Sequence, residues 1–239
     1  MKKGNWKFID VSNHWDNVDY DSDNSNIDSY YRRFLDTKKM VDIPLESNVL
    51  DVDCRSGNGT VFFKKLYPHS NFFSGAMADS FAKSSALRFK ENDIKSHIFR
   101  YRNYTLPFDD NFFDFIFSYE TLEHIPYPEI FLKEITRVMK PNASLILTTP
   151  NEFWEPVHWF SATFGIDHGE GPHRMVPRCE IVDMFKENHL KIVIEKSTVI
   201  IPLGPRLLLK FGKWLERKLP ESVLRIICLR RSFLCKKVQ

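Results

Sequence analysis

Nine residues in the first third of the chain have the composition of a ligand-binding turn. Asp51-Val-Asp-Cys-Arg-Ser-Gly-Asn-Gly continues an apolar strand pattern and runs into a helical pattern at residues 60–66. A turn between a strand and a helix presents backbone amides at a helix N-terminus, where nucleotide-like ligands bind. Gly57 and Gly59 are therefore candidate ligand-binding residues, although glycine in such a turn often serves only the turn itself.

A second polar cluster occupies residues 167–174, with the sequence Asp-His-Gly-Glu-Gly-Pro-His-Arg. His168, His173 and Arg174 could recognise a phosphate, a sugar or a carboxylate, with one histidine as a base. The spacing of the histidines and acids matches no established metal-ligand motif, so we predict no metal site. A glycine-rich polar loop without chemistry is the alternative.

The elements that must position these residues alternate between strand and helix patterns, which is typical of a parallel sheet with right-handed crossovers. The expected strands are 48–54, 71–76, 97–101, 113–118, 144–149 and 191–199, and the expected helices are 59–66, 79–92, 129–139 and 180–188. The fourth and fifth strands are mostly apolar, as strands covered on both faces must be. The fold class is therefore α/β, a doubly wound, mainly parallel sheet with helices on both faces.

The central part of the sequence closely resembles one family. Leu106-Pro-Phe, Phe113-Asp-Phe-Ile, Leu122-Glu-His-Ile with Pro126, and the run from Leu132 to Pro141 match the second half of class I, Rossmann-like, small-molecule methyltransferases of the type 11 kind. The resemblance covers residue 48 to about residue 190. It implies a sheet of the seven-stranded type, S-adenosyl-L-methionine as the methyl donor, and an enzyme whose main task is to align the acceptor with an activated methyl group.

The resemblance also implies the site residues. We expect the donor to meet Asp51, Asp53, Cys54, Arg55, Ser56, Gly57, Met77, Ala78, Arg102, Asn103, Tyr104 and Tyr119. Catalytic candidates near the acceptor are Glu120, His124, His168 and His173. Capping and orienting of the loop before Pro126 is an equally good account of Glu123 and His124.

The donor side departs from the family pattern. Asp53 and Arg55 replace two of the three glycines of the first turn, Met77 stands where the family has an acid for the ribose hydroxyls, and Arg102 stands where an acid usually meets the adenine amino group. Each lost polar contact costs about 1–3 kcal/mol. Arg55 could instead pair with the donor carboxylate, or with Asp51 or Asp53.

The C-terminal part of the chain is strongly basic. Residues 203–239 hold ten Lys or Arg against two Glu, a net charge of +8, which leaves −5 for residues 1–202. Leu208, Phe211, Trp214 and Leu215 share one side of a predicted helix whose basic residues lie off that side. Such a helix can lie in a membrane interface or pack on its own domain. Nucleic acid is the weaker expectation, because aliphatic residues outnumber aromatic ones.

Length, composition and cysteine spacing bound the organisation of the chain. We expect a polar N-terminal segment with a cap helix at 1–46, a methyltransferase domain at 47–202 and a basic amphipathic helical extension at 203–239. Residues 10–28 are too polar for us to expect tight packing there. The four cysteines form no C-x-x-C pair, so we expect reduced thiols. The start of the chain lacks a secretion signal, so a cytoplasmic protein, in membrane contact through its tail at most, is expected.

Two functions remain open at this point. The first is S-adenosylmethionine-dependent methyl transfer to a small-molecule acceptor or to a lipid- or sugar-linked one. The second is a catalytically inactive, methyltransferase-like binding or regulatory subunit, indicated by Asp53, Arg55, Met77 and Arg102.

Overall fold

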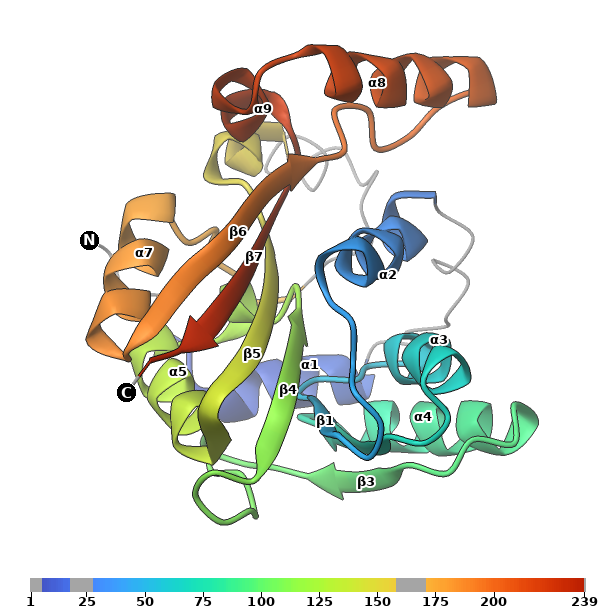
Figure 1. Cartoon of the computed structure of the whole chain (residues 1–239), viewed down its shortest axis with the longest axis vertical. Coiled ribbons are helices and arrows are strands. Elements are labelled where there is room, and N and C mark those ends of the chain that lie inside the picture. Colours follow the sequence, from blue (N-terminus) through green and yellow to red (C-terminus); the bar gives the residue numbers. More distant parts are fainter. Residues whose placement is uncertain (1–5, 18–27, 158–170, 239) are drawn as a thin grey trace.

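The computed structural model describes residues 6–17, 28–157 and 171–238, and it contains one seven-stranded sheet (Figure 1). The strand order is β3-β2-β1-β4-β5-β7-β6, and only β7 runs antiparallel to its neighbours. The strands are β1 (Asn48–Asp51), β2 (Asn71–Ala76), β3 (His97–Arg100), β4 (Phe113–Tyr119), β5 (Met139–Pro150), β6 (Leu190–Thr198) and β7 (Arg230–Lys237). The expected doubly wound, mainly parallel α/β sheet is confirmed.

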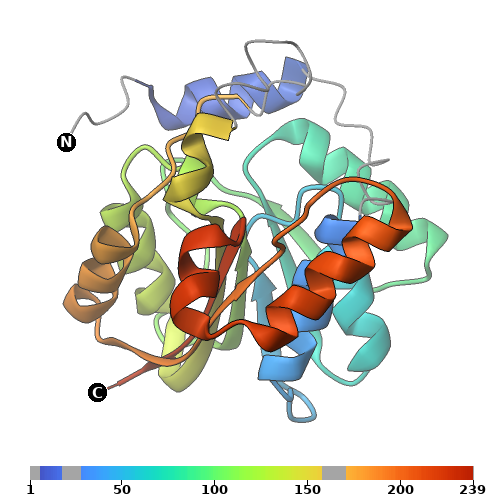
Figure 2. The ribbon, with the colours of Figure 1, turned by 90° about the horizontal axis from the view of Figure 1, so that it is seen from above.

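Helices cover both faces of the sheet (Figures 1 and 2). They are α1 (Phe8–Asn17), α2 (Asp28–Met40), α3 (Asn58–Leu66), α4 (Asp79–Glu91), α5 (Pro128–Val138), α7 (Arg178–Glu187), α8 (Arg206–Lys218) and α9 (Glu221–Ile227), with short 3-10 turns η2 (Leu122–His124) and η3 (Glu152–Trp154). Side chains of α5 and α7 share a buried cluster with one face of β4 and β5, and side chains of α2 and α3 share a second cluster with the other face.

Burial on both faces explains the apolar strands. Six of the seven residues of β4 are buried, and they pair in parallel with β1 on one side and β5 on the other. Phe117 belongs to the α2 and α3 side of the core, whereas Ile116 belongs to the α5 and α7 side. The alternation fixes the register, since a slip by one residue would exchange the two faces.

The C-terminal boundary predicted at residue 202 is wrong for the last segment of the chain. Residues 230–237 form β7, which lies between β5 and β6 and pairs with both. Phe233 and Cys235 of this strand are fully buried, and its first residues, Arg230 and Arg231, are buried in ion pairs. The sheet is therefore complete only with the end of the chain, and just α8 and α9 match the expected helical extension.

The N-terminal segment also packs more tightly than its composition predicts. Phe8, Val11 and Trp15 of α1 are buried in the main core cluster. They recur at helical spacing, so one apolar stripe is buried while Asp10 and Asn13 between them are exposed. Among the described residues, no helix is both long and apolar enough to cross a bilayer.

Candidate functional site

The expected donor turn lies where the resemblance places it, between β1 and α3. Arg55 and Gly57 both have left-handed backbone, with φ of 45° and 77°. Gly57 precedes α3, and any Cβ there would stand 2.7 Å from the ring of Phe89. Glycine is therefore required at position 57 by both backbone conformation and space.

Two buried carboxyl groups stand at the base of this turn. Burial raises the pKa of Asp51 to about 7, although Thr60 donates a 3.0 Å hydrogen bond to it. Burial likewise raises the pKa of Asp53 to about 6, against the opposing charge of Arg55, whose Nε lies 3.8 Å from an Asp53 oxygen. One carboxylate oxygen of each aspartate is buried without a hydrogen-bond partner. Of the partners that the sequence allowed for Arg55, the structure shows an ion pair with Asp53.

Helix α1 lies against this turn and against the ends of the neighbouring strands. The Ser12 hydroxyl donates a 2.7 Å hydrogen bond to the carbonyl of Met77, and the Asp16 carboxylate accepts from the amide of Ser80 at 2.8 Å. The Trp15 ring lies 5.4 Å from the guanidinium carbon of Arg55. These contacts join α1 to both the first turn and the start of α4.

The apolar side chains of α1 fill the donor side of the sheet. Phe8 packs against Tyr101 and Tyr104, with ring centroids 5.7 and 5.3 Å apart, and Trp15 packs against Phe81 at 5.4 Å. Five of the twelve predicted donor residues are buried on this side of the sheet: Asp53, Cys54, Met77, Ala78 and Tyr104. With α1 in this position, its side chains pack against the predicted donor residues Arg55, Met77 and Tyr104.

Three predicted donor residues lie elsewhere. Arg102 and Asn103 are exposed in the turn after β3, where Arg102 forms an isolated bridge with Thr105. Tyr119 packs against Phe34, with ring centroids 5.2 Å apart, on the α2 and α3 face of the sheet. Since alternate residues of a strand point to opposite faces, the last residue of β4 turns away from α1.

Glu120 is held by arginines instead of standing open in a cleft. Its carboxylate lies 2.6 Å from Nε of Arg230 and 2.8 Å from Arg33, and its backbone carbonyl accepts from the Arg55 guanidinium. Burial opposes ionisation, but the charges of Arg230 and Arg33 lower the pKa of Glu120 to about 2. A carboxylate with so low a pKa is a weak proton acceptor, and it ties α2 to the start of β7.

His124 and His173, two of the catalytic candidates, lie close together. Their ring centroids are 6.1 Å apart, and the His124 ring also contacts Trp15 at 5.6 Å. Burial, reinforced by the charge of Arg55, lowers the pKa of His124 well below its ordinary value, so the ring is neutral near pH 7. Nδ1 of His124 lies 3.3 Å from the Pro172 carbonyl, which can only accept, so Nδ1 carries the proton of this hydrogen bond and Nε2 is unprotonated.

Glu123 orients the loop that carries His173. Its carboxylate accepts a 3.3 Å hydrogen bond from Thr149, and its backbone carbonyl accepts a 2.8 Å hydrogen bond from the amide of Arg174. Arg174 in turn pairs with Glu180 of α7 at 3.1 Å. Asp167, His168 and Glu170 of the same predicted cluster lie outside the described residues.

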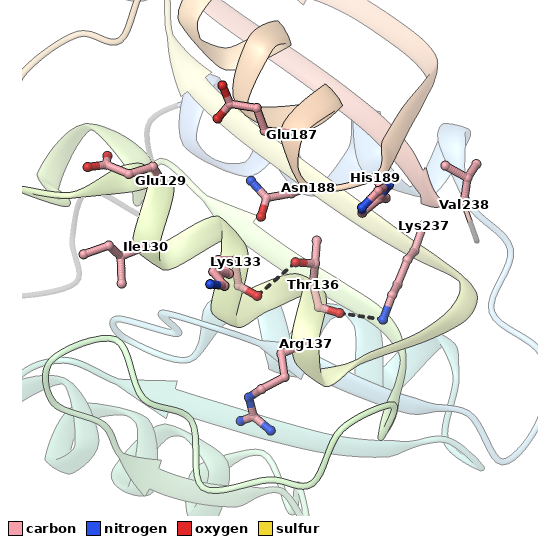
Figure 3. Close-up of a pocket in the computed structure, with 10 residues that line it drawn as sticks. All are labelled: Glu129, Ile130, Lys133, Thr136, Arg137, Glu187, Asn188, His189, Lys237 and Val238. Carbon is pink, nitrogen blue, oxygen red and sulfur yellow. Dashed lines mark hydrogen bonds between the residues drawn. The ribbon is translucent and has the colours of Figure 1, made fainter.

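Three cavities of the described chain lie away from these residues. One of about 740 Å³ is bordered by α5, the end of α7 and the end of β7 (Figure 3). Lys237 reaches across it to the Thr136 carbonyl at 2.7 Å. Because β7 is antiparallel, Lys237 marks the amino edge of the parallel strands, the edge opposite the donor turn. None of the predicted site residues lines this cavity.

Sequence reasoning missed the residues that close the site. Ser12 and Trp15 were assigned to a loosely docked segment, although Phe8, Val11 and Trp15 at spacings of three and four are a helical signal. Arg33 and Arg230 carried no local signal, because their partner Glu120 is far from both in sequence.

Comparison with known proteins finds relatives that match the part of the chain containing the donor turn and His124. A family model described as a methyltransferase domain matches residues 50–147. Residues 50–147 carry a methyltransferase domain. An uncharacterized methyltransferase of Schizosaccharomyces pombe is 34% identical over 100 residues, covering 39% of this chain and 36% of that protein. The sterol 24-C-methyltransferase of the same organism is 26% identical over 152 residues, covering 59% and 39%.

Solved methyltransferase structures share the whole fold. An S-adenosylmethionine-dependent methyltransferase from Aquifex aeolicus superposes with a TM-score of 0.64 at 15% identity, covering 98% of this chain and all of that one. The geranyl diphosphate C-methyltransferase of Streptomyces coelicolor, solved with S-adenosylhomocysteine, gives 0.65 at 15% identity, covering 87% and 76%. The chain spans under two fifths of each curated relative's length, so the shared region is the methyltransferase domain.

Proposed function

We propose that this methyltransferase domain binds S-adenosylmethionine and transfers its methyl group to a small-molecule acceptor. The observation that carries the proposal is the family match over residues 50–147, which contains the turn at Gly57 and the paired strands β1 and β4. The donor supplies an already activated methyl group, so the protein must bind, orient and exclude water. His124 and His173 are our candidates for accepting a proton from the acceptor.

The finer proposal concerns the acceptor, which we infer to be apolar and lipid- or sugar-linked. Two matched proteins are named for a sterol and for geranyl diphosphate, molecules that each have a hydrocarbon portion. The exposed basic and apolar C-terminal helix supports an acceptor reached from a membrane surface by a cytoplasmic protein. Glu120 is not part of this proposed acid–base chemistry, since its carboxylate is held in ion pairs with Arg33 and Arg230.

The proposal includes a conformational condition: α1 must leave the donor side before S-adenosylmethionine binds. Three side chains of α1 contact predicted donor residues. Trp15 contacts Arg55, Phe8 contacts Tyr104, and Ser12 hydrogen-bonds to Met77. The apparent affinity for the donor is then lowered, because only those molecules in which α1 is displaced can bind it.

Calorimetric titration of the purified chain with S-adenosylmethionine and with S-adenosylhomocysteine tests the donor assignment. Saturable heat with both ligands is expected, in the micromolar to millimolar range. No heat at millimolar concentration with the unmodified chain or with a variant that frees α1, Phe8→Ala with Trp15→Ala, would remove the proposal.

A second function, an inactive binding or regulatory subunit, is favoured by one specific observation: Asp53 and Arg55 form an ion pair under α1 in the donor turn. It predicts that donor binding appears only after Asp53→Gly, Arg55→Gly and Met77→Asp are combined. Donor binding by the unmodified chain, at any affinity that calorimetry resolves, contradicts it.

A further inference from the structure

We propose that α8 docks this protein on the surface of a lipid bilayer that contains anionic lipids. A surface helix normally buries its apolar stripe and exposes its polar one. Helix α8 does the reverse: Leu207 is 81% exposed, and Phe211 and Trp214 are each 50% exposed. The stacked rings of Phe211 and Trp214, 5.7 Å apart, form one continuous apolar surface with Leu207 and the exposed Leu208.

The outward direction of these side chains is fixed by the opposite side of the helix. Gly212 is the buried residue of α8, and it packs so closely on Ile201 that a Cβ would stand 3.2 Å from that side chain. Glu216 accepts hydrogen bonds from the amides of Val199 and Ile200, both at 3.1 Å, and pairs with Arg32 of α2. Rotating α8 to bury its aromatic residues would break these contacts.

Basic side chains frame the apolar surface. Arg206, Lys210, Arg217 and Lys218 are exposed on α8, while the acid of this helix, Glu216, is already paired. Exposed cations around a partly inserted apolar stripe are complementary to anionic headgroups above hydrocarbon. Trp214 has the amphipathic ring that prefers the boundary between the two.

Other occupants fit this surface less well. A second copy of the chain would bring two sets of exposed α8 cations together, which opposes association. A nucleic acid would meet the cations but leave the exposed leucines in water. A bilayer with anionic lipids satisfies the charge and the apolar area at the same time.

The position of α8 gives the contact a functional meaning. Figure 1 shows α8 beyond the end of the sheet at which β5 and β6 finish, the edge that also carries Glu120 and the donor turn. Figure 2 shows α1 on a different side of this edge from α8. Docking through α8 would therefore hold the carboxyl edge near the membrane without covering α1.

Co-sedimentation of the full chain with vesicles tests this proposal, and it needs no methyl donor, so its outcome is separate from that of methyl transfer. Binding to phosphatidylcholine vesicles containing phosphatidylserine is expected, with at least about tenfold weaker binding to phosphatidylcholine alone. Phe211→Ser with Trp214→Ser should weaken binding at least about tenfold, as should Lys210→Gln with Arg217→Gln and Lys218→Gln. The matched control, Leu87→Ser with Ile130→Ser, changes two exposed apolar residues of α4 and α5 and should bind as the parent does.

Fluorescence quenching by brominated lipid gives a second measurement on the unmodified chain. Trp214 should be quenched by anionic brominated vesicles, and Trp214→Phe should lose that component. The proposal is overturned by absence of both vesicle binding and quenching, or by equal loss of binding in the control. A dimer in light scattering that the serine variant abolishes, with no vesicle binding, would assign the surface to a second copy, and salt-sensitive oligonucleotide binding alone would assign it to nucleic acid.

Discussion

Trp15 of α1 stands over Arg55 of the donor turn, with its ring centroid 5.4 Å from the guanidinium carbon, and the same ring contacts His124 at 5.6 Å. One N-terminal side chain thus touches both the expected donor side and the expected acceptor side. Arg55 also reaches the backbone of Glu120, so the turn after β1 and the turn after β4 are joined beneath Trp15. The N-terminal helix is therefore part of the site.

Replacing this tryptophan should open the donor side. Removing a buried Trp costs about 3–5 kcal/mol of packing, here the packing of α1. If α1 competes with the donor, Trp15→Ala should strengthen S-adenosylhomocysteine binding by about tenfold or more in calorimetry. Trp214→Ala, an exposed tryptophan on α8, is the matched control and should leave affinity unchanged. Equal or weaker binding by Trp15→Ala would show that α1 supports the donor site instead of competing for it.

Glu120→Gln should destabilise the fold strongly. The variant leaves Arg33 and Arg230 buried without their counter-charge, at a cost of about 3–5 kcal/mol in the free energy of unfolding near pH 7. Because the pKa of Glu120 is lowered from 4.5 to about 2, its contribution is present above pH 4.5 and is lost as the pH falls toward 2.

Urea unfolding across that range measures both effects. The difference between Glu120→Gln and the parent should shrink between about pH 4.5 and pH 2. Glu155→Gln, an exposed glutamate after η3, should match the parent throughout. A pH-independent difference would mean that packing, and not charge, accounts for the loss.

Asp51→Asn should stabilise the protein at higher pH. The folded-state pKa of Asp51 is raised from 3.8 to about 7, so the cost of its ionisation is absent below pH 3.8 and is fully imposed above pH 7. We expect a gain of about 1–3 kcal/mol near pH 8 and little change near pH 4, since one pKa unit corresponds to about 1.4 kcal/mol. Thermal unfolding at the two pH values measures it, with the exposed Asp109→Asn as control. The same gain at both pH values would argue against a buried, titrating carboxyl.

Removal of residues 229–239 should unfold the domain. The deletion takes out β7 and leaves β5 and β6 with unpaired edges. It also removes Arg230 and Arg231, which pair with Glu120 and Glu152 respectively. Circular dichroism should show loss of a cooperative melt. The serine variant at Phe211 and Trp214 should keep the parent melting temperature within about 2 °C, because surface changes cost little. A truncated chain that melts cooperatively would make β7 an accessory strand.

The sequence by itself determined the alternation of strands and helices, the donor turn and the amphipathic character of residues 207–219. These features are local: β4 is mostly apolar because both of its faces are covered, and the helical period of α8 can be counted along the chain. The family motifs around Phe113 and Leu122 are also contiguous, so the resemblance to methyltransferases is visible in the sequence alone.

Only the tertiary structure decided which segments close the sheet and the site. Residues 230–237 carry arginines and lysines at both ends, and they form an inner strand because Glu120 and Glu152 supply counter-charges from distant parts of the chain. Helix α1 is polar in composition, yet three side chains suffice to bury it on the donor turn. Pairing between distant residues leaves no local periodicity in the sequence. Burial of a charge depends on an oppositely charged partner, and composition does not show where that partner lies.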